Sequence, residues 1–255
     1  MQILLPPSET KRDGGWGPAL DLDTLSHPEL STARREVLDA VRALSPDEAA
    51  AARALKLGAK AAAVEIARNR ELESSQTMPA IERYTGVLFD ALAVQEWQRD
   101  ARRRASRHLM VHSALFGLVA ADDLIPAYRL SHDSRLPGVR LRSHWAQLNA
   151  AVLRSLDGPL IDLRSAGYAS LGPLPDRDDA VTVRVVAVGD DGVARALNHF
   201  NKKGKGEFVR ALLSAGPLPS SIDAVCRVST ELGWPLRQCA ARELELVVPG
   251  VLPPR

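Results

Sequence analysis

The sequence predicts a mixed α/β protein, of the α/β or α+β class, folded as a single compact domain over residues 1–255. Short apolar runs bounded by turn residues indicate several strands, and longer stretches with apolar residues at helical spacing indicate many helices. A length of 255 residues suits one large domain or two small ones. With 45% hydrophobic residues, a chain of this length can bury a core without disulfides.

The first strand is predicted at residues 2–5, because this apolar run is stopped by Pro6 and Pro7. The polar residues 8–11 that follow are expected in a loop at the end of that strand. Residues 13–28 are rich in Gly, Asp and Pro, which is typical of a surface loop.

The next stretch, residues 32–70, is predicted to be helical. Ser45 begins a helix-start signal, with Ser at the N-cap, Pro at the first helical position and Glu at the third. A short segment that contains Gly58 interrupts the helical pattern. Two short helices joined through a glycine-containing turn would form a helical hairpin inserted at about residues 45–70.

The rest of the chain is predicted to mix strands, helices and irregular segments. In the middle we expect a turn or short strand at 84–89, a helix at 92–120, an irregular segment at 125–136, a helix at 142–156 and a strand at 159–163 that runs into a loop at 164–168. Toward the C-terminus we expect a hairpin of strands 181–188 and 193–200 around a turn at 189–192, a loop at 201–206, helices at 207–214 and 220–232, and a last strand at 243–248.

The charge balance excludes a histone-like polycation, because 33 Lys and Arg stand against 31 Asp and Glu, for a net charge of +2. A local basic surface stays possible, since net charge says nothing about distribution. Only six of the basic residues are lysines, and they fall in three places: Lys11, then Lys56 and Lys60, then Lys202, Lys203 and Lys205. Lys and Arg differ in geometry and hydration, so these places are the first in which to look for an anion-binding surface.

Neither the cysteines nor the first residues indicate an extracellular protein. Cys226 and Cys239 are too few for a disulfide framework and are expected to be buried free thiols. Residues 1–7 have no basic stretch and no long apolar run, so no signal peptide is expected. No segment approaches the roughly 20 apolar residues of a membrane span. We expect a soluble cytoplasmic protein that does not contact membranes.

Six polar or glycine-containing blocks stand out over about 200 residues of the chain. They are Pro6-Pro7-Ser8-Glu9-Thr10-Lys11, Tyr84-Thr85-Gly86, residues 113–130, His144-Trp145, residues 161–168 and residues 198–206. Each block alone is a weak signal. Together, in this order, they resemble the peroxide stress protein YaaA family over nearly the whole chain.

This resemblance implies an unusual mixed α/β fold, called the cantaloupe fold, with a helix-hairpin-helix element. It also implies that the protein binds duplex DNA in a basic cleft and limits iron-linked oxidative damage. Phosphate-dominated binding of this kind would show little preference for base sequence. Residues 57–61 contain one glycine, where the turn of such an element usually reads apolar-x-Gly-apolar-Gly.

The blocks supply hydroxyl groups and cations at loop ends, which is the chemistry that holds phosphates. A helix N-terminus after residues 201–206 would add free amides, and strand-end loops are where open α/β sheets bind ligands. The candidate phosphate- or nucleic-acid-binding residues are Ser8, Thr10, Lys11, Lys56, Lys60, Thr85, Tyr128, Arg129, Arg164, Ser165, Tyr168, Lys202, Lys203 and Lys205. The candidates for a catalytic role are Lys11, Tyr84, Arg129 and Lys202.

Structural explanations compete with these assignments. Residues 202–205 are also typical of a solvated loop, and residues 8–11 of turn chemistry. The arginines between residues 99 and 107 could form a solvated helix face that Glu96 and Asp100 offset. Four aromatic residues either stack on bases or pack in the core: Tyr84, Tyr128, Tyr168 and Trp145.

His108 and His112 are four residues apart and could share one helix face, but two packed histidines are the expected outcome. We therefore expect no metal and no cofactor. Two functions are consistent with the sequence. The favoured one is a DNA-binding protein of the peroxide response, and the alternative is an enzyme that acts on a small phosphorylated or nucleotide-like substrate in the same cleft. A deep pocket ringed by the four catalytic candidates would favour the enzyme, and a long shallow groove would favour DNA.

Overall fold

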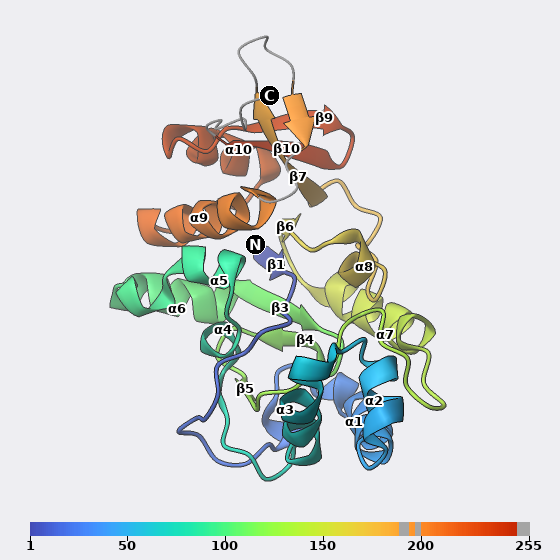
Figure 1. Cartoon of the computed structure of the whole chain (residues 1–255). Coiled ribbons are helices and arrows are strands. Elements are labelled where there is room, and N and C mark those ends of the chain that lie inside the picture. The colour runs from blue at the N-terminus through green and yellow to red at the C-terminus, as the bar shows by residue number, and fades with distance from the viewer. Residues whose placement is uncertain (189–193, 197–199, 249–255) are drawn as a thin grey trace, which may run out of the picture.

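The computed structural model describes residues 1–188, 194–196 and 200–248, whose elements surround one large β-sheet (Figure 1). Within these residues the sheet has eight strands, and seven of them follow the order β4-β3-β1-β6-β7-β10-β9, with β8 paired to β7. Their bounds are β1 Gln2–Leu5, β3 Leu109–Ser113, β4 Gly117–Ala120, β6 Leu160–Asp162, β7 Ala180–Val188, β8 Ala194–Ala196, β9 Leu236–Ala240 and β10 Glu243–Val248. A second, two-stranded sheet pairs β2 (Met78–Pro79) with β5 (Leu124–Ile125). The predicted mixed α/β class is confirmed.

The centre of the large sheet is parallel and buried. β1 lies between β3 and β6 and runs parallel to both, with Ile3 opposite Leu109 on one side and Ile161 on the other. Every residue of β3 and β6 is buried, which is typical of parallel strands covered on both faces. The chain goes from β1 to β3 on one side and later to β6 on the other, so the direction of winding reverses at β1.

Helices cover both faces of this sheet (Figure 1). Their bounds are α1 Ser31–Leu44, α2 Glu48–Ala54, α3 Ala59–Arg70, α4 Ala80–Arg83, α5 Val87–Leu92, α6 Arg99–His108, α7 Leu141–Ser155, α8 Ala166–Ala169, α9 Phe200–Ala215 and α10 Ile222–Glu231. On one face α5 and α6 pack against α9, and α6 also contacts β1 and β3. On the other face α7 packs against β4.

The predicted helical hairpin contains α2 and α3, which are joined by residues 55–58. In this turn Lys56 has a left-handed φ of 55°, and Gly58 directly precedes α3. The N-cap of α2 is Asp47 and not Ser45, because the Asp47 carboxylate accepts a hydrogen bond from an amide of the first turn at 2.9 Å. Ser45 instead ends α1 and is buried.

The prediction of a single helix over residues 92–120 is wrong. The segment contains the end of α5, then α6, and then the antiparallel strands β3 and β4. The apolar residues 109–111 are buried throughout, and such a run does not distinguish a buried strand from a buried helix. His108 therefore ends α6 whereas His112 is buried in β3, so the two do not share a helix face.

The lysine-rich segment predicted as a loop is part of α9, which begins at Phe200. Two glycines inside this helix mark close contacts. A Cβ on Gly206 would lie 2.3 Å from the Leu88 carbonyl oxygen of α5, and a Cβ on Gly204 would lie 2.7 Å from Val248 of β10. The glycines therefore serve close packing within a helix, although in the sequence they suggest a loop.

One more difference concerns the C-terminal part. Strand β9 was missed because four of its five residues are exposed, so it carries little of the apolar pattern that marks a strand. β8 pairs antiparallel with β7 as predicted. The predicted turn at residues 189–192 and residues 197–199 lie outside the described residues.

Two buried arginines fix loops to the core. Arg34 of α1 donates to the carbonyl oxygens of Ser26, Phe116 and Leu118 at 2.7–2.9 Å. Arg83 of α4 donates to four carbonyl oxygens from three separate segments, those of Arg12, Gly14, Gln76 and Ile125. Part of the high arginine content thus serves the fold and not the surface.

Candidate functional site

A pocket of about 560 Å³ lies at the carboxyl ends of β1 and β6, beside the first turns of α5 and α9. Its volume is within the range of roughly 300–1,000 Å³ of small-molecule sites. The winding of the sheet reverses at β1, and open α/β sheets bind ligands where the winding reverses. The pocket is lined by Pro6, Pro7, Ser8, Glu9, Thr10, Thr85, Gly86, Val87, Leu88, Phe89, Ser131, His132, Asp133, Ser165, Tyr168, Asn201, Lys202 and Lys205.

Three hydroxyl groups form a cluster on one side of the pocket. The Thr85 hydroxyl donates to Thr10 Oγ1 at 3.0 Å, and Ser8 Oγ lies 3.2 Å from the same Thr10 oxygen. Gly86 has a left-handed φ of 93°, and a Cβ there would lie 3.3 Å from both Ser8 Oγ and Thr10 Oγ1. A glycine at this position therefore keeps the backbone close to the hydroxyl cluster.

Lys11 lies behind this cluster and not in the pocket. Its ammonium group donates to the Ser8 carbonyl oxygen at 3.0 Å and lies 4.0 Å from the centre of the Tyr128 ring. The side chain is only 6% exposed. Burial, together with the nearby positive charge of Arg129, lowers the pKa of Lys11 to about 7. Lys11 thus supports the loop that carries Ser8 and Thr10.

Two of the candidate tyrosines belong to the core. The Tyr84 and Tyr128 hydroxyls are 2.7 Å apart, and the Tyr128 hydroxyl is also 2.7 Å from Ser113 Oγ. Both side chains are buried, as is Trp145, and burial raises the pKa of both tyrosines. The core-packing explanation is confirmed for these three aromatic residues. Tyr168 differs, because it lines the pocket with its ring against His132 at a centroid distance of 5.0 Å.

Arg164 is buried in an ion-pair network below the pocket. Its guanidinium donates to both carboxylate oxygens of Asp162 at 2.6 and 2.8 Å and lies 2.7 Å from Nδ1 of His112. Burial, followed by the charge of Arg164, lowers the pKa of His112 well below its ordinary value, so His112 is neutral at neutral pH. The network links β3 to β6 and leaves Arg164 away from the pocket surface.

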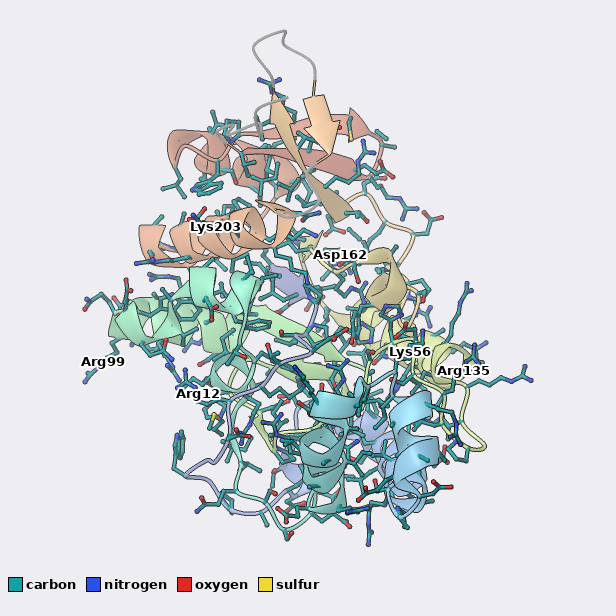
Figure 2. The ribbon with its side chains drawn as sticks, in the orientation of Figure 1. Arg12, Lys56, Arg99, Arg135, Asp162 and Lys203 are labelled. Atoms are coloured by element: carbon teal, nitrogen blue, oxygen red, sulfur yellow. The ribbon has the colours of Figure 1, made fainter. Side chains whose placement is uncertain are left out.

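Two of the three C-terminal lysines line the pocket. Lys202 is exposed in the first turn of α9, and Lys205 is 7% exposed and donates to the Leu163 carbonyl oxygen at 2.8 Å. Burial lowers the pKa of Lys205 to about 8. Lys203 is not in the pocket wall and lies 3.6 Å from Glu207 one turn later in α9 (Figure 2).

The hairpin turn lies next to the pocket wall. Lys56 of the turn forms an ion pair of 2.5 Å with Asp133, which lines the pocket. The amide of Arg135 donates to the Ala54 carbonyl oxygen at the end of α2. Figure 2 accordingly shows Lys56 and Arg135 on the same side of the molecule, away from Arg12 and Arg99. Lys60 is exposed on the first turn of α3.

The structure thus brings together seven of the candidate binding residues in the pocket: Ser8, Thr10, Thr85, Ser165, Tyr168, Lys202 and Lys205. Of the four catalytic candidates, only Lys202 lines it. Arg129 pairs with Glu9 at 2.8 Å, and Lys11 and Tyr84 are buried. The sequence criterion of a pocket ringed by all four is therefore not met.

Sequence reasoning missed the pocket residues of α5 and of the loop after β5. The sequence predicts a turn or short strand at residues 87–89, but these residues form the first turn of α5 and the apolar wall of the pocket. His132 carried no motif. The glycine at position 167 is the sequence feature that relates to His132. A Cβ at this position would lie 2.4 Å from the His132 ring, so a glycine leaves room for the ring.

Three arginines of α6, namely Arg102, Arg103 and Arg104, have partners, and one of these partners is Asp100, as the competing explanation predicted. Arg103 pairs with Asp100 at 2.8 Å, and Arg104 donates to a carbonyl oxygen of α9. The expected contribution of Glu96 is wrong, because this carboxylate pairs with Arg210 of α9.

Three further features concern metal ligands, membrane-spanning helices and cysteines in the part of the chain that the structure describes. There, no three His, Cys, Asp or Glu side chains are grouped as metal ligands, and no helix is long and apolar enough to cross a membrane. Cys226 is half-buried and Cys239 exposed, both as free thiols, so the predicted burial is wrong for Cys239.

Comparison with known proteins shows the family of this sequence. A sequence model described as peroxide stress protein YaaA matches residues 1–230. The chain belongs to the YaaA family. Similar YaaA relatives carry the name UPF0246 protein: one from Corynebacterium efficiens is 44% identical over 84% of this chain and 86% of its own length. Another from Streptomyces coelicolor is 40% identical over 92% of this chain and 91% of its own length. A more distant relative from Shewanella sediminis is 24% identical over 84% of this chain and 86% of its own.

Proposed function

We propose that this YaaA family member binds duplex DNA during peroxide stress, with the turn between α2 and α3 as its main backbone contact. The observation that carries the proposal is the position of this turn beside the pocket, joined to it through the Lys56–Asp133 ion pair. Lys60 is exposed on the first helical turn, where the amides of a helix have no carbonyl partner within the helix. Amides and cations at a helix N-terminus bind phosphate.

The charges around the turn support contact with phosphates and not with bases. Lys56 is 53% exposed although it is paired, and Arg135 and Lys60 are exposed. Lys56 extends from the turn, Arg135 from a loop and Lys60 from the first turn of α3. Binding through such contacts is expected to depend strongly on salt and little on base sequence.

The test is a charge reversal on the turn. Lys60→Glu is expected to weaken binding of a fluorescein-labelled duplex by about tenfold or more at low salt, and to reduce the salt dependence by about one phosphate contact. Arg227→Glu is the control, because Arg227 is exposed on α10 at the far end of the molecule from α3 (Figure 1). Fluorescence anisotropy against salt concentration measures both.

Equal binding by the wild type and Lys60→Glu would contradict the assignment of the turn, and no binding at low salt would contradict the function itself. We further propose that DNA binding limits iron-linked oxidative damage. A strain that carries only Lys60→Glu should then survive peroxide no better than a strain without the protein.

A second candidate function is binding or turnover of a small phosphorylated molecule. The pocket volume and its place where the winding reverses favour this function independently of the turn. Nucleoside monophosphates titrated into the protein in a calorimeter test it. If they bind wild type and not a Lys205→Ala variant, the pocket acts on free ligands; absence of heat with any of them counts against it.

A further inference from the structure

We propose that the pocket receives one unpaired nucleotide from DNA held at the α2–α3 turn. This inference rests on the proposed function, and it gives that function a preferred substrate: a duplex with a mismatched or unpaired base. Three features carry it, namely the chemistry of the pocket walls, the position of its cations and the connection between the pocket and the turn.

The walls match the parts of a nucleotide. Leu88, Phe89 and Tyr168 give apolar and aromatic surface, on which a base stacks favourably. The hydroxyl cluster of Ser8, Thr10 and Thr85 lies on another side of the same pocket and can bond to sugar and phosphate oxygens. An inorganic anion would leave the apolar wall without a partner, and an apolar ligand would leave the hydroxyl cluster with no hydrogen bond beyond those within the cluster.

Cations and a helix N-terminus provide the place for a phosphate. Lys202 and Lys205 both come from the start of α9, which is 16 residues long. The Lys205 ammonium group is almost fully buried, so its field acts in a medium that screens charge weakly. Of its three N–H donors, the Leu163 carbonyl oxygen takes one.

Asn201 adds an acceptor for a base edge. In the described part of the chain its Oδ1 atom is buried without a hydrogen-bond partner, although the residue lines the pocket. An unpaired buried acceptor raises the free energy of the empty state. A rotation of the amide toward a base amino group would satisfy this oxygen.

The turn and the pocket share one segment of the chain, residues 131–135. Ser131, His132 and Asp133 line the pocket, while Asp133 pairs with Lys56 and the Arg135 amide bonds to the end of α2. A strand whose phosphates contact the turn therefore passes the pocket mouth. Only the nucleotide at that point needs to leave the stack.

Removing a base from a duplex costs a few kcal/mol, and least where the base is already mismatched or unpaired. The proposal therefore predicts that a duplex with one mismatch binds at least about tenfold more tightly than its fully paired counterpart, because part of that cost is already met in the mismatched duplex. Departure of the base also unstacks its neighbour in the strand, and a fluorescent base at that neighbouring position reports the change.

The experiment uses a duplex with one mismatch, a 2-aminopurine directly 3′ of the mismatched base and a fluorescein label at one end. Anisotropy of the label measures binding to the full-length protein, and 2-aminopurine emission measures unstacking. Ser165→Trp and Val87→Trp are designed to fill the pocket from two sides, because both residues line it and are exposed. Ser214→Trp is the matched control, since Ser214 is exposed in the last turns of α9.

Wild type and Ser214→Trp are expected to raise the 2-aminopurine emission severalfold, whereas both filling variants bind the duplex with little rise. Circular dichroism checks that each variant is folded. Binding by the wild type without a rise, or an equal rise with both filling variants, overturns the pocket proposal while DNA binding stands. No anisotropy change with any duplex overturns both.

Discussion

Lys11 belongs to a candidate binding motif, but its side chain stabilises the loop of residues 8–10 and does not line the pocket. It is held under residues 8–10 by carbonyl oxygens and by the Tyr128 ring. Because its pKa is lowered to about 7, the folded protein releases a proton that the unfolded chain keeps up to about pH 10. Its effect on stability therefore has a defined dependence on pH.

Between about pH 7 and pH 10 the unfolded state binds more protons at Lys11 than the folded state, so this residue makes folding more favourable as the pH rises. Lys11→Met removes that dependence. The free energy of unfolding of wild type minus that of Lys11→Met is expected to rise by roughly 1–3 kcal/mol from about pH 6 to about pH 9. Urea unfolding at the two pH values measures it.

Lys60→Met is the control for this comparison, because Lys60 is exposed on α3. Lys205 also has a lowered pKa, but it is present in all three proteins and cancels in the difference. If the difference in the free energy of unfolding between wild type and Lys11→Met is the same at both pH values, the Lys11 ammonium group is not destabilised by burial.

At the scale of elements, the packing of α9 against α5 depends on a glycine that lowers the helix propensity of α9. Alanine normally stabilises a helix interior over glycine by about 1 kcal/mol. At position 206 the added Cβ would lie 2.3 Å from a backbone oxygen of α5, which cannot rotate away as a side chain could. The clash therefore outweighs the propensity.

Gly206→Ala is expected to lower the free energy of unfolding by about 1–3 kcal/mol, the usual cost of overpacking. The control is Gly58→Ala, because a Cβ there meets no atom within 4 Å and the φ of −73° suits alanine. Gly58→Ala should cost less than about 1 kcal/mol, as for a changed N-cap. A stabilised Gly206→Ala, measured by urea unfolding, would show that α5 and α9 are not in close contact.

Elements with a clear pattern were predictable from the sequence, and elements whose pattern is ambiguous were not. α7, β6 and β10 lie within a few residues of their predicted positions, because their apolar spacing and turn residues agree. The prediction of β3 was wrong because the apolar run of a fully buried strand has the same pattern as a buried part of the preceding helix. The predicted start of α9 was wrong because the sequence does not distinguish glycines that allow close packing from glycines that break a helix.

At the scale of the whole molecule, the site was predictable as an inventory but not as an arrangement. The sequence blocks contain five of the hydroxyl-bearing residues that line the pocket, and four of these five follow strands β1 and β6. Whether a lysine faces the pocket or the core depends on contacts between distant segments. Lys11 and Lys205 are both nearly buried, yet only Lys205 lines the pocket, and nothing in their local sequence separates them.

The same scale explains the structural use of arginine. Arg34 holds three carbonyl oxygens from two separate segments, and each of them would be left without that partner if the side chain were shortened or made apolar. Arg34→Met is expected to lower the free energy of unfolding by about 3–5 kcal/mol. Chemical denaturation measures this loss.

The neighbouring Arg35 supplies the control on the same helix. It is exposed and pairs with Glu73, and such surface pairs contribute about 1 kcal/mol or less. Arg35→Met should therefore change the stability little. Similar losses for the two variants would mean that the carbonyl contacts of Arg34 add nothing to the fold.

The central position of β1 also has a kinetic consequence. Its partners, residues 109–111 and 160–162, are each more than 100 residues away along the chain. Ordering β1 therefore closes very large loops before it gains any pairing, and folds dominated by such distant contacts form slowly. Until those partners arrive, the apolar residues Ile3, Leu4 and Leu5 are exposed, and an exposed strand of this kind is prone to aggregate. The yield of refolding at high protein concentration is thus expected to depend on how fast β1 pairs with β3 and β6 before it aggregates.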